Sequence, residues 1–145
     1  MTSRPAGHVL VEALIAQGVD TAFGVPGESY LAVLDALHDA RIAVTVCRQE
    51  GGAAMMAESH GKPTGQAGVC FVTRGPGATN AVTGIADAFM DSIPLVVITG
   101  QVPTGLIGSD AFQEADTVGI TRHCTKHNYL VKDPSELAAI IDEAF

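Results

Sequence analysis

Residues 47–61 read Cys-Arg-Gln-Glu-Gly-Gly-Ala-Ala-Met-Met-Ala-Glu-Ser-His-Gly. An apolar run over residues 42–46 ends just before this stretch, and a small-residue helix pattern follows. Glu50 is therefore expected where a strand ends and a helix begins, at the rim where open parallel α/β sheets bind ligands. Gly51 and Gly52 carry no side chains and would let a flat ligand approach closely. Alternatively, Glu50 is an ordinary charge at a helix N-terminus, worth about 0.3–1 kcal/mol. The stretch alone leaves both interpretations open.

Composition bounds the class of protein. The 145 residues are 47% hydrophobic and 17% charged, which favours one folded domain with a substantial core. The net charge of −8, with no Lys or Arg cluster, argues against a nucleic-acid surface. No apolar run approaches the roughly 20 residues that cross a bilayer, so no membrane partner is expected. Three scattered cysteines favour reduced thiols in the cytoplasm over a disulfide framework.

Hydrophobic periodicity predicts alternating helices and strands. Helices are expected over residues 6–17 and 29–39, from Glu50 onward, and from the 73–80 turn to Met90. A last helix is expected after Asp133, which would cap it, with Pro134 at the first helical position. The strands are expected over 20–24, 42–47, 69–72, 95–98 and 128–131, of which 69–72 and 95–98 read as buried on both faces. Residues 62–68 are expected to be loop, and 101–118 irregular with at most a short helix near 112–116. This pattern predicts an α/β fold, a parallel central sheet with helices on both faces.

Residues 73–80, Thr-Arg-Gly-Pro-Gly-Ala-Thr-Asn, form a glycine-rich turn between a buried strand and a helix. Such a turn can present backbone N–H groups to an anion. A dinucleotide-binding interpretation is disfavoured because Asn80 stands at the last glycine position and no acidic residue follows at the required distance. From spacing alone, a packing turn without a ligand is favoured.

Other candidate groups give weaker evidence for a functional site. His123, Cys124 and His127 lack zinc-ligand spacing and a fourth ligand, so no metal site is expected. Met55 and Met56 are interpreted as core residues. Ser29 and Ser92 have no convincing His/Asp partners, which makes a catalytic nucleophile a poor interpretation.

Four motifs taken together resemble the pyrimidine-binding (PYR) domain of thiamine-diphosphate enzymes, and their order matches through nearly the whole chain. They are Phe23-Gly24-Val25-Pro26-Gly27, Arg48-Gln49-Glu50-Gly51, Gly75-Pro76-Gly77-Ala78-Thr79-Asn80 and Gly100-Gln101-Val102-Pro103. Residues 107–116 and 124–128 are most similar to acetohydroxyacid (acetolactate) synthase, a family of branched-chain amino acid biosynthesis.

The resemblance implies a thiamine-diphosphate carboligase that decarboxylates pyruvate and transfers the two-carbon unit to a second 2-keto acid. Glu50 would hydrogen-bond N1′ of the aminopyrimidine and favour the imino tautomer, whose 4′ nitrogen removes the C2 proton. Further contacts to the pyrimidine would come from Pro26, Thr73, Pro76, Gly77 and Asn80. Gly27 and Phe112 would contact the substrate, and Gln113 would be a second catalytic residue.

The sequence departs from the family at the rim. Glu28 and Ser29 stand where acetohydroxyacid synthases usually have Gly-Ala, and Arg74 stands where they usually have Ser. Glu50 is followed by Gly-Gly in place of Gln-Gly. A carboxylate at position 28 is expected to repel a keto acid, by roughly 4 kcal/mol at about 4 Å and an effective dielectric of about 20.

The resemblance also implies that the whole enzyme has domains that these 145 residues do not include. In the family a separate domain with a Gly-Asp-Gly…Asn pattern holds the diphosphate and Mg²⁺, and that pattern does not occur here. Residues 1–145 would then be one pyrimidine-binding domain of a larger enzyme, without the sheet's last strand. The active site would lie at the subunit interface of a homodimer or higher oligomer, and FAD, where used, would be held mainly by another domain. On its own the chain is expected to be inactive and to self-associate. The alternatives are another thiamine-diphosphate decarboxylase or lyase, and a non-catalytic α/β binding or interaction domain.

Overall fold

A computed structural model describes residues 4–145 of the chain. Its strands are β1 (Thr21–Gly24), β2 (Ala43–Val46), β3 (Gly68–Val72) and β4 (Leu95–Thr99). Its α-helices are α1 (Ala6–Ala16), α2 (Leu31–His38), α3 (Glu50–Thr64), α4 (Gly75–Met90), α5 (Thr117–Thr121) and α6 (Leu137–Ala144). Short 3₁₀ turns occupy Glu28–Tyr30, Thr104–Leu106 and Pro134–Glu136.

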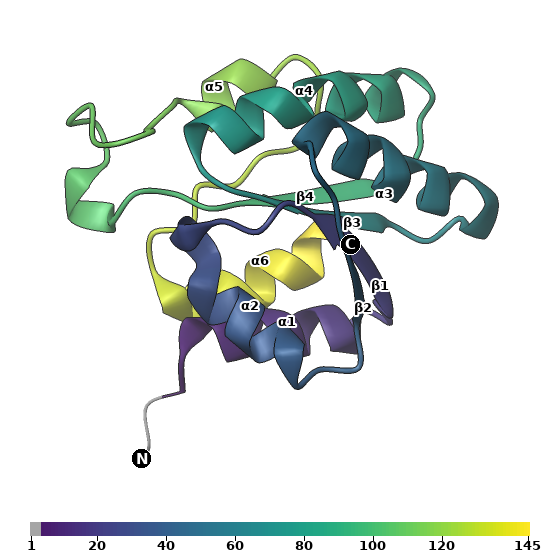
Figure 1. The fold of residues 1–145 in the computed structure, drawn as a ribbon, viewed down its shortest axis with the longest axis horizontal. Helices are drawn as coiled ribbons and strands as arrows, with labels where there is room; N and C mark the ends of the chain where they lie inside the picture. The colour runs from purple at the N-terminus through teal and green to yellow at the C-terminus, as the bar shows by residue number, and fades with distance from the viewer. Residues whose placement is uncertain (1–3) are drawn as a thin grey trace.

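The strands form one parallel sheet in the order β2-β1-β3-β4. Helices α1, α2 and α6 cover one face, and α3, α4 and α5 cover the other (Figure 1). The predicted α/β fold with a parallel sheet and helices on both faces is confirmed. Because parallel strands all run the same way, their carboxyl ends meet at one edge of the sheet, and the connections that follow them share one rim.

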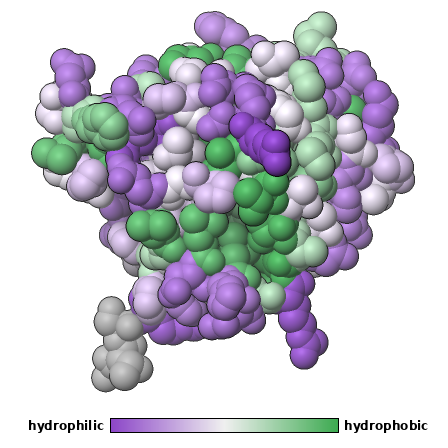
Figure 2. All heavy atoms as spheres, in the orientation of Figure 1, coloured by the Kyte–Doolittle hydropathy of each residue, from purple (hydrophilic) through white to green (hydrophobic). Residues whose placement is uncertain are grey.

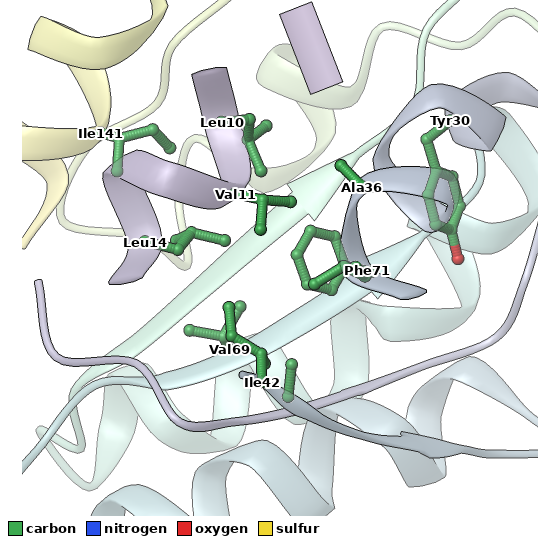
Figure 3. Packing of buried hydrophobic residues seen from close by; sticks show 11 residues of the cluster. Leu10, Val11, Leu14, Tyr30, Ala36, Ile42, Val69, Phe71 and Ile141 are labelled. Atoms are coloured by element: carbon green, nitrogen blue, oxygen red, sulfur yellow. The ribbon is translucent and has the colours of Figure 1, made fainter. Parts of the chain in front are cut away.

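The central strand β3 explains the two cores. Its side chains alternate, so Val69 and Phe71 enter the core beneath α1 and α2, whereas Cys70 and Val72 enter the core beneath α3 and α4. Figure 3 shows the first core, where Phe71 lies among side chains from α1, α2 and the sheet. All four of these residues are at most 2% exposed, which confirms the prediction that this strand is buried on both faces.

The core beneath α3 and α4 is built from small side chains, mainly alanines. At Gly84 an added Cβ would lie 2.7 Å from the Cβ of Ala54. The two helices therefore lie close together, and this spacing brings the start of α3 beside the start of α4. An ion pair between Lys62 and Asp91, 3.0 Å apart, joins the other ends of the two helices.

Several sequence-based boundaries were wrong. Helix α3 continues to Thr64, into the first part of the predicted 62–68 loop, and it ends at Gly65, whose left-handed φ of 67° and bond to the Gly61 carbonyl terminate it. No helix forms over 112–116, because Asp116 instead caps α5 by accepting from the Gly119 N–H at 2.9 Å. Asp133 accepts from the Ser135 N–H as predicted, although the first turn that follows is 3₁₀.

The predicted strand over residues 128–131 is also absent from the described part of the chain. The Asn128 side chain bonds back to Thr121 and Thr125 at 2.7 and 2.8 Å, and this ties the start of the segment to α5. Within residues 4–145, β4 pairs with β3 alone and its side chains are only half-buried. The prediction that β4 is buried on both faces was therefore wrong, because β4 lies at the edge of this sheet.

The surface keeps some apolar side chains. Met55 and Met56 were predicted to be core residues. They are 41% and 42% exposed, so this prediction was wrong. Figure 2 shows apolar surface gathered in the lower middle of the view, with hydrophilic surface around it. No helix in the described range 4–145 combines the length and hydropathy needed to cross a membrane.

Candidate functional site

Glu50 is the first residue of α3 and lies at the carboxyl-terminal rim of the sheet, as predicted. Gln49 fixes this start, because its side-chain oxygen accepts from the Gly52 N–H at 2.8 Å. Glutamine is not a favoured capping residue, so the sequence did not reveal this role. The Glu50 side chain is half-buried and keeps a defined direction into the rim.

Asn80 holds one oxygen of this carboxylate. Its side-chain N–H donates to Glu50 Oε2 at 2.9 Å across the α3–α4 contact. The other oxygen, Oε1, has no hydrogen-bond partner among residues 4–145. A carboxylate with one oxygen anchored and the other unpaired is suited to accept a hydrogen bond from a ligand.

Gly77 leaves room beside that unpaired oxygen. A Cβ at this position would lie 3.5 Å from Glu50 Oε1 and 2.8 Å from Thr73 Cγ2. Any side chain here would therefore clash with Thr73 and narrow the approach to Glu50. The residues present fit a flat ring that approaches Oε1 over the glycine.

Thr73 connects the turn after β3 to the turn after β1. Its hydroxyl lies 2.8 Å from the hydroxyl of Ser29, within hydrogen-bond distance. A Cβ at Gly27 would meet Thr73 at 2.6 Å, so the two turns touch backbone to side chain. Glu50, Asn80, Gly77, Thr73 and Gly27 thus form one continuous set of contacts.

Tyr30 is a positioning residue that the sequence analysis missed. Its hydroxyl donates to the Val25 carbonyl, and its ring stacks on Phe71 with centroids 6.2 Å apart. Burial raises the pKa of the Tyr30 phenol to about 12, with smaller contributions from Cys70 and Glu50. The phenol therefore stays protonated and holds the turn from Val25 to Gly27 in place. A lone Tyr in a helical pattern gives no sequence signal for this contact.

Pro26 and Pro76 are exposed residues on the same rim. Pro26 follows Val25, whose N–H donates to the Phe71 carbonyl at 3.2 Å, so the chain stays against the sheet until the proline. Pro76 stands near the start of α4, where its missing N–H leaves no helical bond unmade. Each proline gives its turn a fixed φ.

Phe112 and Gln113 come from the connection between β4 and α5, which projects from the body at the left of Figure 1. Phe112 is 72% exposed, and Gln113 has a left-handed φ of 61°. The Gln113 carbonyl packs on Gly75, which has no Cβ to block it. These two residues therefore lie near the start of α4, next to the Glu50 cluster and without direct contact to Glu50.

Arg74 and Glu28, the two unusual residues at the rim, contact each other through an ion pair. The Glu28 carboxylate is therefore neutralised by a guanidinium, which removes the basis for the expected repulsion of a keto acid. The charge at Glu28 must be considered together with the charge at Arg74.

One further surface feature involves none of these rim residues. A shallow hollow of about 420 Å³ is lined by Phe23, Met55, Met56, Ser59 and His60. No group of three or more His, Cys, Asp or Glu side chains in residues 4–145 has a geometry that could hold a metal ion. His123, Cys124 and His127 are among the residues covered by that statement.

The parallel sheet, the glycine-rich start of α4 and the carboxylate at the start of α3 agree with the α/β pyrimidine-binding domain that the sequence resemblance implies. Comparison with known proteins agrees: the family described as "Thiamine pyrophosphate enzyme, N-terminal TPP binding domain" matches residues 4–120. The chain belongs to this family.

Similar proteins include acetolactate synthase large subunits from several kingdoms. The chain is 54% identical to acetolactate synthase isozyme 2 large subunit of Escherichia coli over 136 residues, 94% of this chain and 25% of that protein. It is 53% identical to the mitochondrial acetolactate synthase catalytic subunit of Saccharomyces cerevisiae over 140 residues, 96% of this chain and 20% of that protein. The chloroplastic acetolactate synthase of Arabidopsis thaliana is 49% identical over 143 residues, 98% of this chain and 21% of that protein. The chain therefore spans a fifth to a quarter of the length of these relatives.

Proposed function

We propose that this chain is the pyrimidine-binding module of a thiamine-diphosphate carboligase of the acetolactate synthase type. Such an enzyme decarboxylates pyruvate and joins the two-carbon unit to a second 2-keto acid. One observation carries the proposal: Glu50 has Oε2 held by Asn80 at 2.9 Å, and its Oε1, beside Gly77, has no hydrogen-bond partner in the described residues 4–145. The high identity to acetolactate synthases supports the same reaction class.

When bound, thiamine diphosphate supplies the electron sink that decarboxylation of a 2-keto acid requires. Glu50 Oε1 would accept a hydrogen bond from N1′ of the pyrimidine and so favour the tautomer whose exocyclic nitrogen can act as a base. Asn80 prevents the carboxylate from rotating away. The remaining pyrimidine contacts come from Pro26, Thr73, Pro76 and Gly77.

Substrate contacts lie on the outer side of the same rim. Gly27 would lie beside the keto acid, with Thr73 packed against it, and Phe112 presents an exposed ring. Gln113 adds a polar side chain whose backbone is fixed against Gly75. This arrangement suits a small, partly apolar 2-keto acid.

The module needs partners for the rest of the cofactor. As the family resemblance implies, Mg²⁺ and the diphosphate would be held by a different domain. That domain would come from a second copy of the protein, in a homodimer or higher oligomer of the cytoplasm. FAD, where the enzyme uses it, would be bound outside these residues.

The test is product formation by the whole enzyme that contains this domain. With pyruvate, thiamine diphosphate and Mg²⁺, two pyruvates should give one acetolactate and one CO₂, and omission of thiamine diphosphate should abolish the product. Acetaldehyde and CO₂ without acetolactate would assign a decarboxylase in place of a carboligase. Absence of any pyruvate consumption by the loaded enzyme would favour a non-catalytic binding domain.

A further inference from the structure

Arg74 lies in the connection between β3 and α4 with its side chain only 11% exposed. An arginine is seldom so buried unless its guanidinium is paired. The resemblance to acetohydroxyacid synthases assigns it no role, since those enzymes usually have serine here. Its partners therefore show what this chain uses the position for.

The guanidinium makes three contacts, two of them with Phe112. Arg74 Nε donates to the Phe112 carbonyl at 3.0 Å, and the guanidinium carbon lies 5.6 Å from the centroid of the Phe112 ring. Its Nη2 donates to the carboxylate of Glu28 from the turn after β1. A fixed planar fork can serve a carbonyl, a carboxylate and an aromatic face at the same time, whereas a lysine ammonium cannot reproduce all three.

The loop over residues 108–114 has its own internal support. The Glu114 carboxylate accepts from the N–H groups of Gly108 and Ala111 at 2.5 and 3.1 Å, and these bonds lower its pKa. They set the shape of the loop and not its position on the rim. Position is set by the Gln113 carbonyl against Gly75 and by Arg74.

Of those two, Arg74 supplies the directional contacts. Without it, the Phe112 carbonyl loses its bonding partner and the 72% exposed ring keeps little packing. The loop would then leave the rim while retaining its internal turn. Glu28 orients the guanidinium from the other side and makes the arrangement a bridge between two connections of the sheet.

We propose that Arg74 is a positioning residue that, oriented by Glu28, holds Phe112 and Gln113 at the mouth of the site and so sets the affinity for the 2-keto acid. This inference rests on the proposed function. Arg74 acts through Phe112, not on the cofactor, so it changes the KM for the keto acid without changing thiamine-diphosphate binding. Glu28 supports substrate binding by holding Arg74, which reverses the effect expected from its charge alone.

The test compares Arg74→Ala, Arg74→Lys and Glu28→Gln in the whole enzyme. Loss of a charge-assisted bond predicts that Arg74→Ala raises the KM for pyruvate by about tenfold, with the Kd of thiamine diphosphate within about twofold. Arg74→Lys should recover part of the loss, and Glu28→Gln should raise KM by about threefold. Arg41→Ala, an exposed arginine before β2, is the matched control and should change nothing.

A second readout follows the loop directly. Chymotryptic cleavage after Phe112, measured by mass spectrometry, should be several-fold faster in Arg74→Ala than in the wild type or Arg41→Ala, because a released loop is cut more readily. Unchanged cleavage with a raised KM would overturn the positioning role, and unchanged KM with faster cleavage would overturn the role in substrate affinity. Equal values for both also overturn the proposal. If the wild type forms no acetolactate, the proposed function fails, and the cleavage rates still test the anchoring by Arg74.

Discussion

At the scale of single residues, the proposed site depends on a glycine that has no side chain as well as on the side chains around it. Glu50 Oε1 is open because Gly77 has no side chain, and the neighbouring Thr73 already occupies the space a methyl group would need. The sequence predicted Glu50, Gly77, Thr73 and Asn80 as one group through their motifs, and the structure places them in contact. Their roles toward a cofactor remain a proposal.

We predict that Gly77→Ala in the whole enzyme weakens thiamine-diphosphate binding by about tenfold. The added methyl group would lie 2.8 Å from Thr73 Cγ2 and 3.5 Å from Glu50 Oε1, and such crowding typically costs about 1–3 kcal/mol. Isothermal titration with thiamine diphosphate and Mg²⁺ measures the effect. Gly105→Ala is the control, since no heavy atom lies within 4 Å of its added Cβ. Equal Kd values for wild type and Gly77→Ala would rule out the proposed approach of the ring.

Residue motifs did not predict the supporting contacts. Arg74 and Glu28 are 46 residues apart, and Tyr30 reaches back to Val25 across a turn. Such contacts depend on how the connections fold over the rim, which no local pattern of hydrophobicity or capping records. The expected repulsion by Glu28 took no account of its ion pair with Arg74 for this reason, and its effect on a keto acid stays a prediction.

At the scale of elements, the α3–α4 contact contains a carboxyl group that the sequence analysis did not single out. Glu58 on α3 is only 6% exposed and faces Asp87 of α4, with Asp91 and Lys62 nearby. Burial is the main cause that raises the pKa of Glu58, and the carboxylate of Asp87 adds to it. The folded protein therefore binds this proton more tightly than the unfolded chain does.

The contribution of Glu58 to the stability of the fold should therefore fall as pH rises. The proton on Glu58 contributes stability fully below the pKa of an unfolded glutamate, about 4.3, and the contribution is lost as pH rises through the higher folded pKa. Glu58→Gln, which keeps a donor toward Asp87 without a charge, should become more stable than wild type as pH rises from about 4 to about 8. Urea unfolding across this range measures the difference, with the exposed Glu136→Gln as control. A difference between wild type and Glu58→Gln that does not vary with pH would contradict the assignment.

The elements that the sequence predicted well are those with strong periodicity or caps. The strand ending at Val72 agrees with the structure within one residue, and α4 ends at Met90 as predicted, although it begins at Gly75, inside the predicted 73–80 turn. The predicted strand over residues 128–131 was wrong because an apolar segment needs a neighbouring strand to pair with, and Asn128 bonds to α5 instead. The length of α3 was misjudged because Gly65, and not the earlier Lys-Pro pair, ends the helix.

At the scale of the whole molecule, the parallel sheet gathers four connections on one rim, and the residues proposed for function all lie there. Alternating helices and buried strands were enough to predict the fold class, and the family match confirms it. Half-buried β4 and exposed Phe89, Met90 and Val46 leave apolar surface on this domain. That surface is consistent with the proposed contact to further domains or a second copy.

The central claim is that Glu50 activates thiamine diphosphate through its pyrimidine ring. The most direct measurement is the rate of C2 proton exchange of bound cofactor, followed by NMR, in wild-type and Glu50→Gln forms of the whole enzyme. The account predicts exchange about 10²–10⁴-fold slower in Glu50→Gln, with the fold intact by circular dichroism, because an amide cannot supply the negative charge that favours the reactive tautomer. Exchange as fast as in the wild type would contradict it.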